Sequence, residues 1–110
     1  MAPEGSLKLS KNPQLGRYEA RVGEKVAGFV VYQVQGDRVI FQHTVVKSEF
    51  EGHGIGGQLA KFALEDVRSS GRLILPICPF ISAYISKHLE YVRYVDAAQK
   101  RKFSGPETSD

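Results

Sequence analysis

The sequence has few of the features that mark secreted, metal-binding or membrane proteins. It contains one cysteine, Cys78, so no disulfide can form within the chain and no cysteine metal cluster is available. Its histidines, His43, His53 and His88, lack helical or hairpin metal spacing. No apolar run approaches the roughly 20 residues of a membrane span, and residues 1–5 lack the apolar stretch of a signal peptide. These absences predict a cytoplasmic protein with no metal and no membrane partner.

Tryptophan is absent, and charge of one sign is nowhere concentrated. The 110 residues, 42% of them hydrophobic, predict a single domain over 1–110, with an ordered core at about 7–98 and a polar tail at 99–110. The one basic run, Lys100–Lys102, is typical of a solvated tail, so nucleic acid is not the expected partner. The formal net charge of +3 suits an anionic small ligand without identifying it.

Strand-like segments rich in valine and aromatic residues occupy the first half of the chain. In residues 1–16, only three leucines are able to pack. The predicted strands are Tyr18–Val22, Val26–Val34 and Arg38–Val46. The connections at 23–24 and 36–37 contain glycine and suit tight turns. The pattern predicts an antiparallel meander.

The second half of the chain changes to helical spacing. The stretch Phe50–Gly57 is too glycine-rich to predict regular structure. A helix is expected from Gln58 to a stop at Gly71, then a buried strand, a helix from Pro79 and a last short strand. The two strands are Leu73–Cys78 and Tyr91–Val95. A helical crossover makes the first of them parallel to the third meander strand, and the fold class is mixed α/β.

A glycine-rich turn between a strand and a helix favours an anion site. The first N–H groups of a helix lack internal partners, and the helix dipole is positive there. A triphosphate-binding loop is excluded because Gln58 follows the last glycine instead of Lys-Ser/Thr. The dinucleotide fingerprint is excluded because the order is G-x-G-x-G-G and an antiparallel meander precedes it. Taken alone, the loop is either a flexible connection or a ligand site.

At this loop the chain resembles the GNAT superfamily of acetyl-CoA-dependent N-acetyltransferases, whose signature loop shares the register of Glu51–Gly56. The resemblance covers about residues 17–95 and is more specific to a small YjdJ-type branch. Its further pieces are Phe41–Val46, Phe50–Gly56, Pro76–Phe80 and Tyr84–Ile85. It implies a minimal GNAT fold in which the third meander strand and the strand at 73–78 are parallel neighbours that splay apart.

The resemblance also implies where acetyl-CoA binds. Its pantetheine arm pairs with the backbone of Val45 and Val46, flanked by Tyr84 and Lys87. The pyrophosphate rests on the glycine loop, and the thioester points between His43 and Cys78. The cofactor-binding loop residues are Gly52, His53, Gly54, Ile55, Gly56 and Gly57.

This chain departs from the family pattern at several places. Glu51 stands where the family has Gln or Arg, so we expect it to face solvent. The family's tyrosine acid does not carry over cleanly, because Cys78 takes the asparagine-like position and Tyr84 follows one residue too early. The N-terminal helices that usually build the acceptor site are missing, which favours an open site and a large acceptor such as a protein.

The candidate catalytic residues each have a structural alternative. Cys78 precedes a helix start and is either a nucleophile that forms an acetyl-cysteine intermediate or a small core residue. His43 is either the base for an ammonium acceptor or a buried histidine bonded to the backbone. Tyr84 either contacts pantetheine or simply packs. His53 is expected to contact the cofactor, and His88 to lie on the surface or at a helix end.

Two functions follow. The first is an enzyme that transfers acetyl from acetyl-CoA to an amine, directly or through Cys78. The alternative is a CoA-binding module without turnover, acting as a sensor or a subunit. Nucleic-acid binding through the basic tail is a third hypothesis with less support than these two, because no aromatic residues are interleaved with the basic ones.

Overall fold

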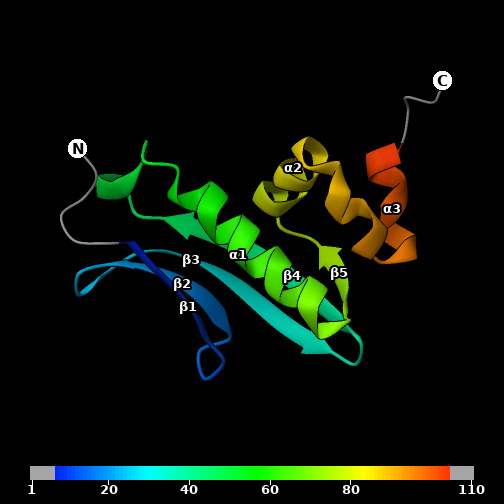
Figure 1. The fold of residues 1–110 in the computed structure, drawn as a ribbon, viewed down its shortest axis with the longest axis horizontal. Helices are drawn as coiled ribbons and strands as arrows, with labels where there is room; N and C mark the ends of the chain where they lie inside the picture. The colour runs from blue at the N-terminus through cyan, green and yellow to red at the C-terminus, as the bar shows by residue number, and fades with distance from the viewer. Residues whose placement is uncertain (1–6, 105–110) are drawn as a thin grey trace.

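A computed structural model describes residues 7–104, which form a five-stranded sheet with helices packed against it (Figure 1). The strands are β1 (Leu7–Asn12), β2 (Arg17–Val22), β3 (Lys25–Gln35), β4 (Arg38–Val46) and β5 (Leu73–Pro76). The helices are α1 (Ile55–Ser70), α2 (Pro79–Lys87) and α3 (Ala97–Ser104), with 3₁₀ helices η1 (Ser48–Phe50) and η2 (Leu89–Tyr94). The strands lie in chain order, β1 to β4 antiparallel and β5 parallel to β4, which confirms the mixed α/β class.

The meander forms where the sequence predicts it. Gly23 and Gly36 adopt φ of 62° and 61° in the two tight turns, a conformation that glycine reaches without steric cost. The turns bring Val22 opposite Lys25 and Gln35 opposite Arg38. As a result, β4 has the predicted bounds, β2 is one residue longer at its start, and β3 is one residue longer at each end.

Strand β1 is an element that the sequence analysis missed. It pairs along its whole length with β2, from Leu7 opposite Val22 onward. Its polar residues obscure the alternation typical of a strand, and one of them, Lys11, contacts residues at the edge of the core. The Lys11 ammonium lies 3.0 Å from the Asp66 carboxylate and over the Tyr18 ring. Backbone pairing with β2, the packing of Leu7 and Leu9 against the core and this exposed ion pair together hold the edge strand.

One continuous core lies between the sheet and helices α1 and α2. Leu59, Ala63 and Leu64 of α1 are fully buried against the sheet, as are Ile81 and Ile85 of α2. The sheet contributes Tyr18, Val30, Val39 and Phe41 to the same cluster. This cluster defines the helix face of the sheet, and the opposite side is called the far face below.

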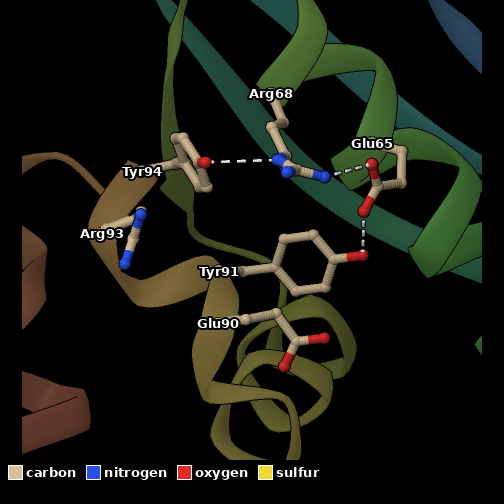
Figure 2. A pocket seen from close by; sticks show the side chains of 6 residues that line it. All are labelled: Glu65, Arg68, Glu90, Tyr91, Arg93 and Tyr94. Atoms are coloured by element: carbon tan, nitrogen blue, oxygen red, sulfur yellow. Dashed lines mark hydrogen bonds and ion pairs between the residues drawn. The ribbon is translucent and has the colours of Figure 1, made fainter.

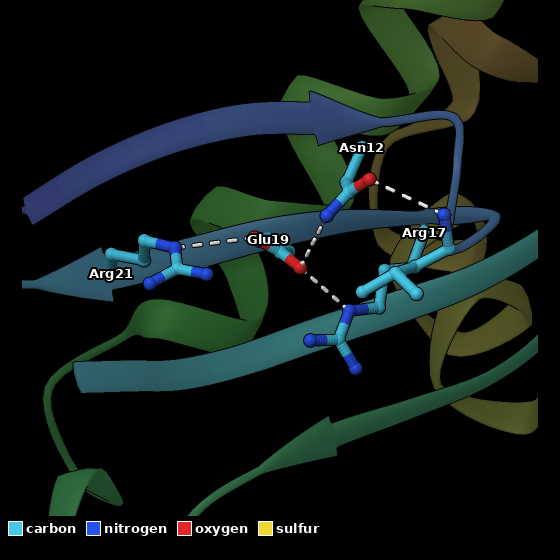
Figure 3. A network of polar contacts seen from close by, with 5 residues as sticks. Asn12, Arg17, Glu19 and Arg21 are labelled. Atoms are coloured by element: carbon cyan, nitrogen blue, oxygen red, sulfur yellow. Dashed lines mark hydrogen bonds and ion pairs between the residues drawn. The ribbon is translucent and has the colours of Figure 1, made fainter. Parts of the chain in front are cut away.

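The far face carries a polar network around one buried carboxylate (Figure 3). Glu19 is only 2% exposed and accepts hydrogen bonds from Arg17 at 2.7 Å, Asn12 at 3.1 Å and Arg21 at 3.2 Å. The bond from Arg17 is the main cause that lowers the pKa of Glu19. Arg17 also stacks over the Phe29 ring at 4.5 Å. The network joins β1, β2 and β3 on the side that α1 does not cover.

Helix α1 begins three residues earlier than predicted, at Ile55 instead of Gln58. Gly54, with φ of 74°, is its N-cap, and the next two glycines belong to its first turn. The prediction that the glycine-rich stretch is irregular throughout was therefore wrong. The helix ends at Gly71, as predicted, in the left-handed conformation.

The chain after α2 also differs from the prediction. Residues Leu89–Tyr94 form η2 rather than a strand, because Tyr91 turns inward and donates its hydroxyl to Glu65 at 2.6 Å. Of the predicted strand, Val95 alone pairs with the sheet in the described chain, as an isolated bridge to Ile74, and the amide of the next residue, Asp96, donates to the Ile74 carbonyl at 2.8 Å.

Helix α3 occupies part of the predicted polar tail. It starts after Asp96, whose carboxylate accepts the Ala98 amide at 3.1 Å and pairs with Arg38 at 2.9 Å. Residues 105–110 of the predicted tail lie outside the described residues. Within 7–104, no helix is long and apolar enough to cross a membrane, and no cluster of three or more His, Cys, Asp or Glu side chains could hold a metal ion.

Candidate functional site

The first turn of α1 presents backbone amides without protein partners. In the described part of the chain, none of the amides from Gly52 to Gly57 donates a backbone hydrogen bond, and the first that does is Gln58, to Gly54 O at 3.1 Å. The N-cap has no side-chain hydrogen bond, and the first turn contains no acidic residue. The positive end of the helix dipole therefore has no acidic residue in its own first turn, and Glu51, just before the loop, is exposed, so this end suits an anion.

A cavity of about 330 Å³ opens in front of this loop. It is lined by Val46, Phe50, Glu51, Gly52, Gly54, Ile55, Gly56, Gly57 and Phe80. The loop glycines have two different roles. Gly52 and Gly54 have positive φ, and a Cβ on either would meet open space. At Gly56 a Cβ would lie 2.8 Å from the tip of the Phe80 ring, so this glycine leaves room for the Phe80 side chain of α2 beside the first turn of α1.

Strands β4 and β5 separate beside the loop, as predicted. They pair from Arg38 with Leu73 to Phe41 with Pro76. The Phe41 carbonyl then accepts both the Ile77 amide, at 3.1 Å, and the Cys78 amide, at 2.8 Å, and β5 ends there. The predicted strand at 73–78 is therefore two residues shorter. Beyond Phe41, the β5 side of β4 has no strand beside it in the described chain, and this edge of β4, against which α2 packs, is called the gap below.

Backbone alternation decides which residues of β4 face the gap. Val46 lies opposite Gly28, and the neighbouring amide of Lys47 donates to Ala27 O at 2.8 Å. Because antiparallel pairs alternate, the N–H and C=O groups of Thr44 and Val46 point into the gap, whereas those of Val45 point toward β3. Of the two valines expected to pair with a ligand, Val46 is the one with free backbone groups.

A β-bulge decides which side chains of β4 face the helices. Tyr32 lies opposite Phe41 and Val31 opposite His43, so Gln42 is an extra residue. Val39 and Phe41 are buried in the core, and unbroken alternation would bring His43 to the same side. The shift brings Thr44 there instead, and His43 is exposed on the far face. The structure therefore does not bring His43 and Cys78 together.

The Cys78 side chain is 1% exposed and belongs to the core cluster. Cys78 is the N-cap of α2 with Pro79 next to it, as the predicted helix start requires. Its Sγ lies 3.2 Å from the Thr44 Oγ1 across the gap. A substrate would reach this sulfur only after neighbouring side chains move.

The remaining candidate residues lie around the cavity and along α2. The Tyr84 ring stacks on His88 with 3.9 Å between centroids, and burial raises its pKa. His88 lies at the end of α2, as expected, with Nδ1 2.8 Å from the Tyr84 carbonyl oxygen. Lys87, in the last turn of α2, and His53, in the loop, are both exposed. Glu51 is exposed at the cavity rim, which matches the expected orientation.

A second cavity, of about 300 Å³, lies between the C-terminal half of α1 and η2 (Figure 2). Glu65 accepts hydrogen bonds from Tyr91 at 2.6 Å and from Arg68 at 2.9 Å. Arg68 also donates to the Tyr94 hydroxyl at 3.2 Å. These polar groups satisfy one another, so the cluster ties η2 to α1. The sequence did not predict it, because its partners are 26 residues apart.

Comparison with known proteins identifies the family. A family model described as GCN5-related N-acetyl-transferase matches residues 17–95. The chain belongs to this family. The matched range runs from the start of β2 through the glycine loop and Cys78 to Val95. The family assignment thus covers the first cavity and the gap, and it confirms the resemblance to GNAT acetyltransferases.

A solved structure of a GNAT protein has the same fold. The chain is similar to the solution structure of a GCN5-like N-acetyltransferase candidate from Staphylococcus aureus, with 21% identity, a TM-score of 0.64, and coverage of 82% of this chain and 88% of that one. It is also similar to a Bacillus subtilis acetyltransferase crystallised with CoA, with 21% identity, a TM-score of 0.48, and coverage of 64% and 62%. No curated protein matches the chain in sequence.

Proposed function

We propose that the chain binds acetyl-CoA across the glycine loop and the gap and transfers the acetyl group to an amine. The single observation that carries this proposal is the meeting of two sets of unpaired backbone groups. Val46 lines the cavity of the glycine loop and directs its own backbone into the gap. One extended ligand with an anionic end therefore fits both, and membership of the N-acetyltransferase family supplies its identity.

The residues fit the parts of this substrate. The pyrophosphate rests on the amides from His53 to Gly57, where Gly52 and Gly54 leave room for its approach. The pantetheine amides pair with β4 at the gap, where Val46 faces them. Tyr84 and the exposed ammonium of Lys87 flank the substrate from α2. Lys87 adds a cation for a phosphate oxygen.

Acetyl transfer proceeds through Cys78 in this proposal. The Cys78 thiolate attacks the thioester carbon, the bond from that carbon to the CoA sulfur breaks, and CoA leaves with the proton that the cysteine gave up. The amine then attacks the acetyl-cysteine, which forms the amide and restores the thiol. His43 lies on the far face, away from Cys78, so it takes no proton from an amine that attacks the acetyl-cysteine, and the base role expected of it has no place in this route. The acceptor in this proposal is a protein.

A second candidate function is a CoA-binding module without turnover. The observation that favours it is the burial of Cys78 together with the placement of His43 on the other face of the sheet. In such a module the loop and the gap still bind CoA, and Cys78 is a core residue. The protein then acts as a sensor or a subunit.

Intact-mass spectrometry after incubation with acetyl-CoA, with a thermal shift on adding CoA, separates the two functions. We expect CoA to raise the melting temperature, because it binds only the folded chain, and one acetyl group to map to Cys78. The Cys78→Ser variant should keep the thermal shift and lose the adduct. A shift without an adduct leaves direct transfer or the binding module. No shift at millimolar CoA contradicts the site assignment.

A further inference from the structure

The bulge in β4 gives one side chain a position that the strand alone would not give it. Phe41 and Thr44 are three residues apart and would face opposite sides of a regular strand. Because Gln42 is inserted between them, both face the helices. Thr44 thereby comes within 3.2 Å of the Cys78 sulfur.

The Cys78 backbone and side chain are both attached to β4. Its amide donates to the Phe41 carbonyl at 2.8 Å, and its carbonyl accepts the Ser82 amide of α2 at 3.0 Å. These two bonds fix the backbone, and the Thr44 hydroxyl is the group that meets the sulfur. In the described chain, Thr44 and Cys78 make the one side-chain hydrogen bond that spans the gap.

We propose that Thr44 is a positioning residue for the acetylation of Cys78, since the bulge at Gln42 turns its hydroxyl onto the cysteine sulfur. This inference rests on the proposed function. Before the reaction, the hydroxyl accepts the S–H proton and fixes the direction of the thiol. Once the thiol has lost its proton, the hydroxyl donates to the sulfur and holds the thiolate at the gap, where the thioester carbon must arrive.

The step that Thr44 assists is a thiol exchange and is balanced without a further reactant. The sulfur of Cys78 forms a bond to the acetyl carbon, and the bond from that carbon to the CoA sulfur breaks. The proton lost by Cys78 ends on the CoA thiol. Thr44 neither gains nor loses a proton overall, so its effect is on rate and direction.

The test measures the rate at which acetyl-CoA adds one acetyl group to Cys78, by intact mass across a pH series. Thr44→Val keeps the shape of the side chain and removes the hydroxyl. We expect its rate to fall at least about tenfold, because a hydrogen bond to a charged group is lost. In Thr44→Val, the pH at which acetylation of Cys78 reaches half of its limiting rate should rise. Thr44→Ser restores the hydroxyl and should recover most of the rate and the original pH profile.

Ser82→Ala is the matched control, since it removes a hydroxyl that bonds the Pro76 carbonyl at the same junction without touching the sulfur. It should acetylate at the wild-type rate, and all variants should keep the CoA thermal shift. Three outcomes would overturn the role of Thr44 and leave the cysteine intermediate standing. They are a wild-type rate in Thr44→Val, a slow rate in Thr44→Ser, and a rate in Ser82→Ala as slow as that of Thr44→Val. A CoA shift with no adduct on the wild type overturns the cysteine intermediate and this role together.

Discussion

The two ends of helix α1 differ in whether their polar groups have hydrogen-bond partners in the protein. The N-terminal end has a glycine cap, no acidic residue in its first turn and backbone amides that no protein group accepts. Toward the C-terminal end, Glu65 and Arg68 are bonded to each other and to two tyrosines of η2. The comparison separates the part of the helix that is available to a ligand from the part that holds the fold together.

The largest effect should come from blocking the N-terminal end with Gly54→Val. The side chain would project into the open space that the pyrophosphate needs, so the thermal shift by CoA should disappear. Gly54 has φ of 74°, and a residue with a Cβ pays about 1–2 kcal/mol of stability in that conformation. Differential scanning fluorimetry with and without CoA measures both effects.

Gly71→Val provides the control for that strain. Gly71 caps the other end of the same helix with φ of 78°, and a Cβ there also meets open space. This variant should lose similar stability and keep its full CoA shift. Equal loss of CoA binding in both variants would show that strain in α1, and not the side chain in the loop, is responsible.

At the C-terminal end, Tyr91→Phe should destabilise the fold and leave CoA binding unchanged. The variant removes the hydroxyl that Glu65 accepts at 2.6 Å. We expect a loss of about 1 kcal/mol in the free energy of unfolding, near the low end for a bond to a charged group, because the Glu65 side chain is 40% exposed. Urea unfolding gives this value. A weaker CoA affinity in this variant would mean that the two ends are coupled.

The same bond should make that stability difference depend on pH. The hydrogen bond from Tyr91 is the main cause that lowers the pKa of Glu65 in the folded chain. A lowered folded pKa contributes stability that is present above the unfolded pKa and is lost as pH falls through the folded one. The difference in the free energy of unfolding between wild type and Tyr91→Phe should therefore be largest at neutral pH and disappear on acidification. A stability difference that stays constant to low pH would contradict the role of the ionised carboxylate.

The smallest effect should follow from Arg68→Gln. Arg68 is exposed, so little change in stability is expected, but its hydrogen bond is the main cause that lowers the pKa of Tyr94. Removing the guanidinium should raise that pKa toward the ordinary tyrosine value. An absorbance titration of the phenols detects the change. Tyr91 does not interfere, because burial raises its pKa far above the ordinary range.

The elements with a clear local pattern could be predicted from the sequence. Valine-rich strands with glycine turns identified the meander, and the glycine loop before an amphipathic helix identified the candidate anion site. Strand β1 and helix α3 could not be predicted in this way, because their own sequences are largely polar and each also contacts residues that are distant in the chain. Lys11 meets Asp66 on α1, and Asp96 meets Arg38 on β4.

The catalytic geometry was the hardest part to predict. The family resemblance placed His43 beside the thioester, and unbroken alternation from the buried Phe41 would have turned its side chain to the helix face. The extra residue, Gln42, reverses that assignment for every later position of the strand. Nothing in the sequence around Gln42 marks a bulge, since it has neither glycine nor proline nearby. The contact between Thr44 and Cys78 therefore became visible only in three dimensions.

That bulge lets β4 carry one extra residue without changing which later side chains face the gap. Deletion of Gln42 would leave Phe41 and Thr44 two residues apart, so simple alternation would keep both on the helix face and Thr44 opposite Cys78. Insertions and deletions are usually tolerated in loops and damaging in strands. Here the loss of one residue inside a strand would leave the same side chain facing Cys78, so homologous chains that differ in length at this point should be aligned by structure before their catalytic residues are compared.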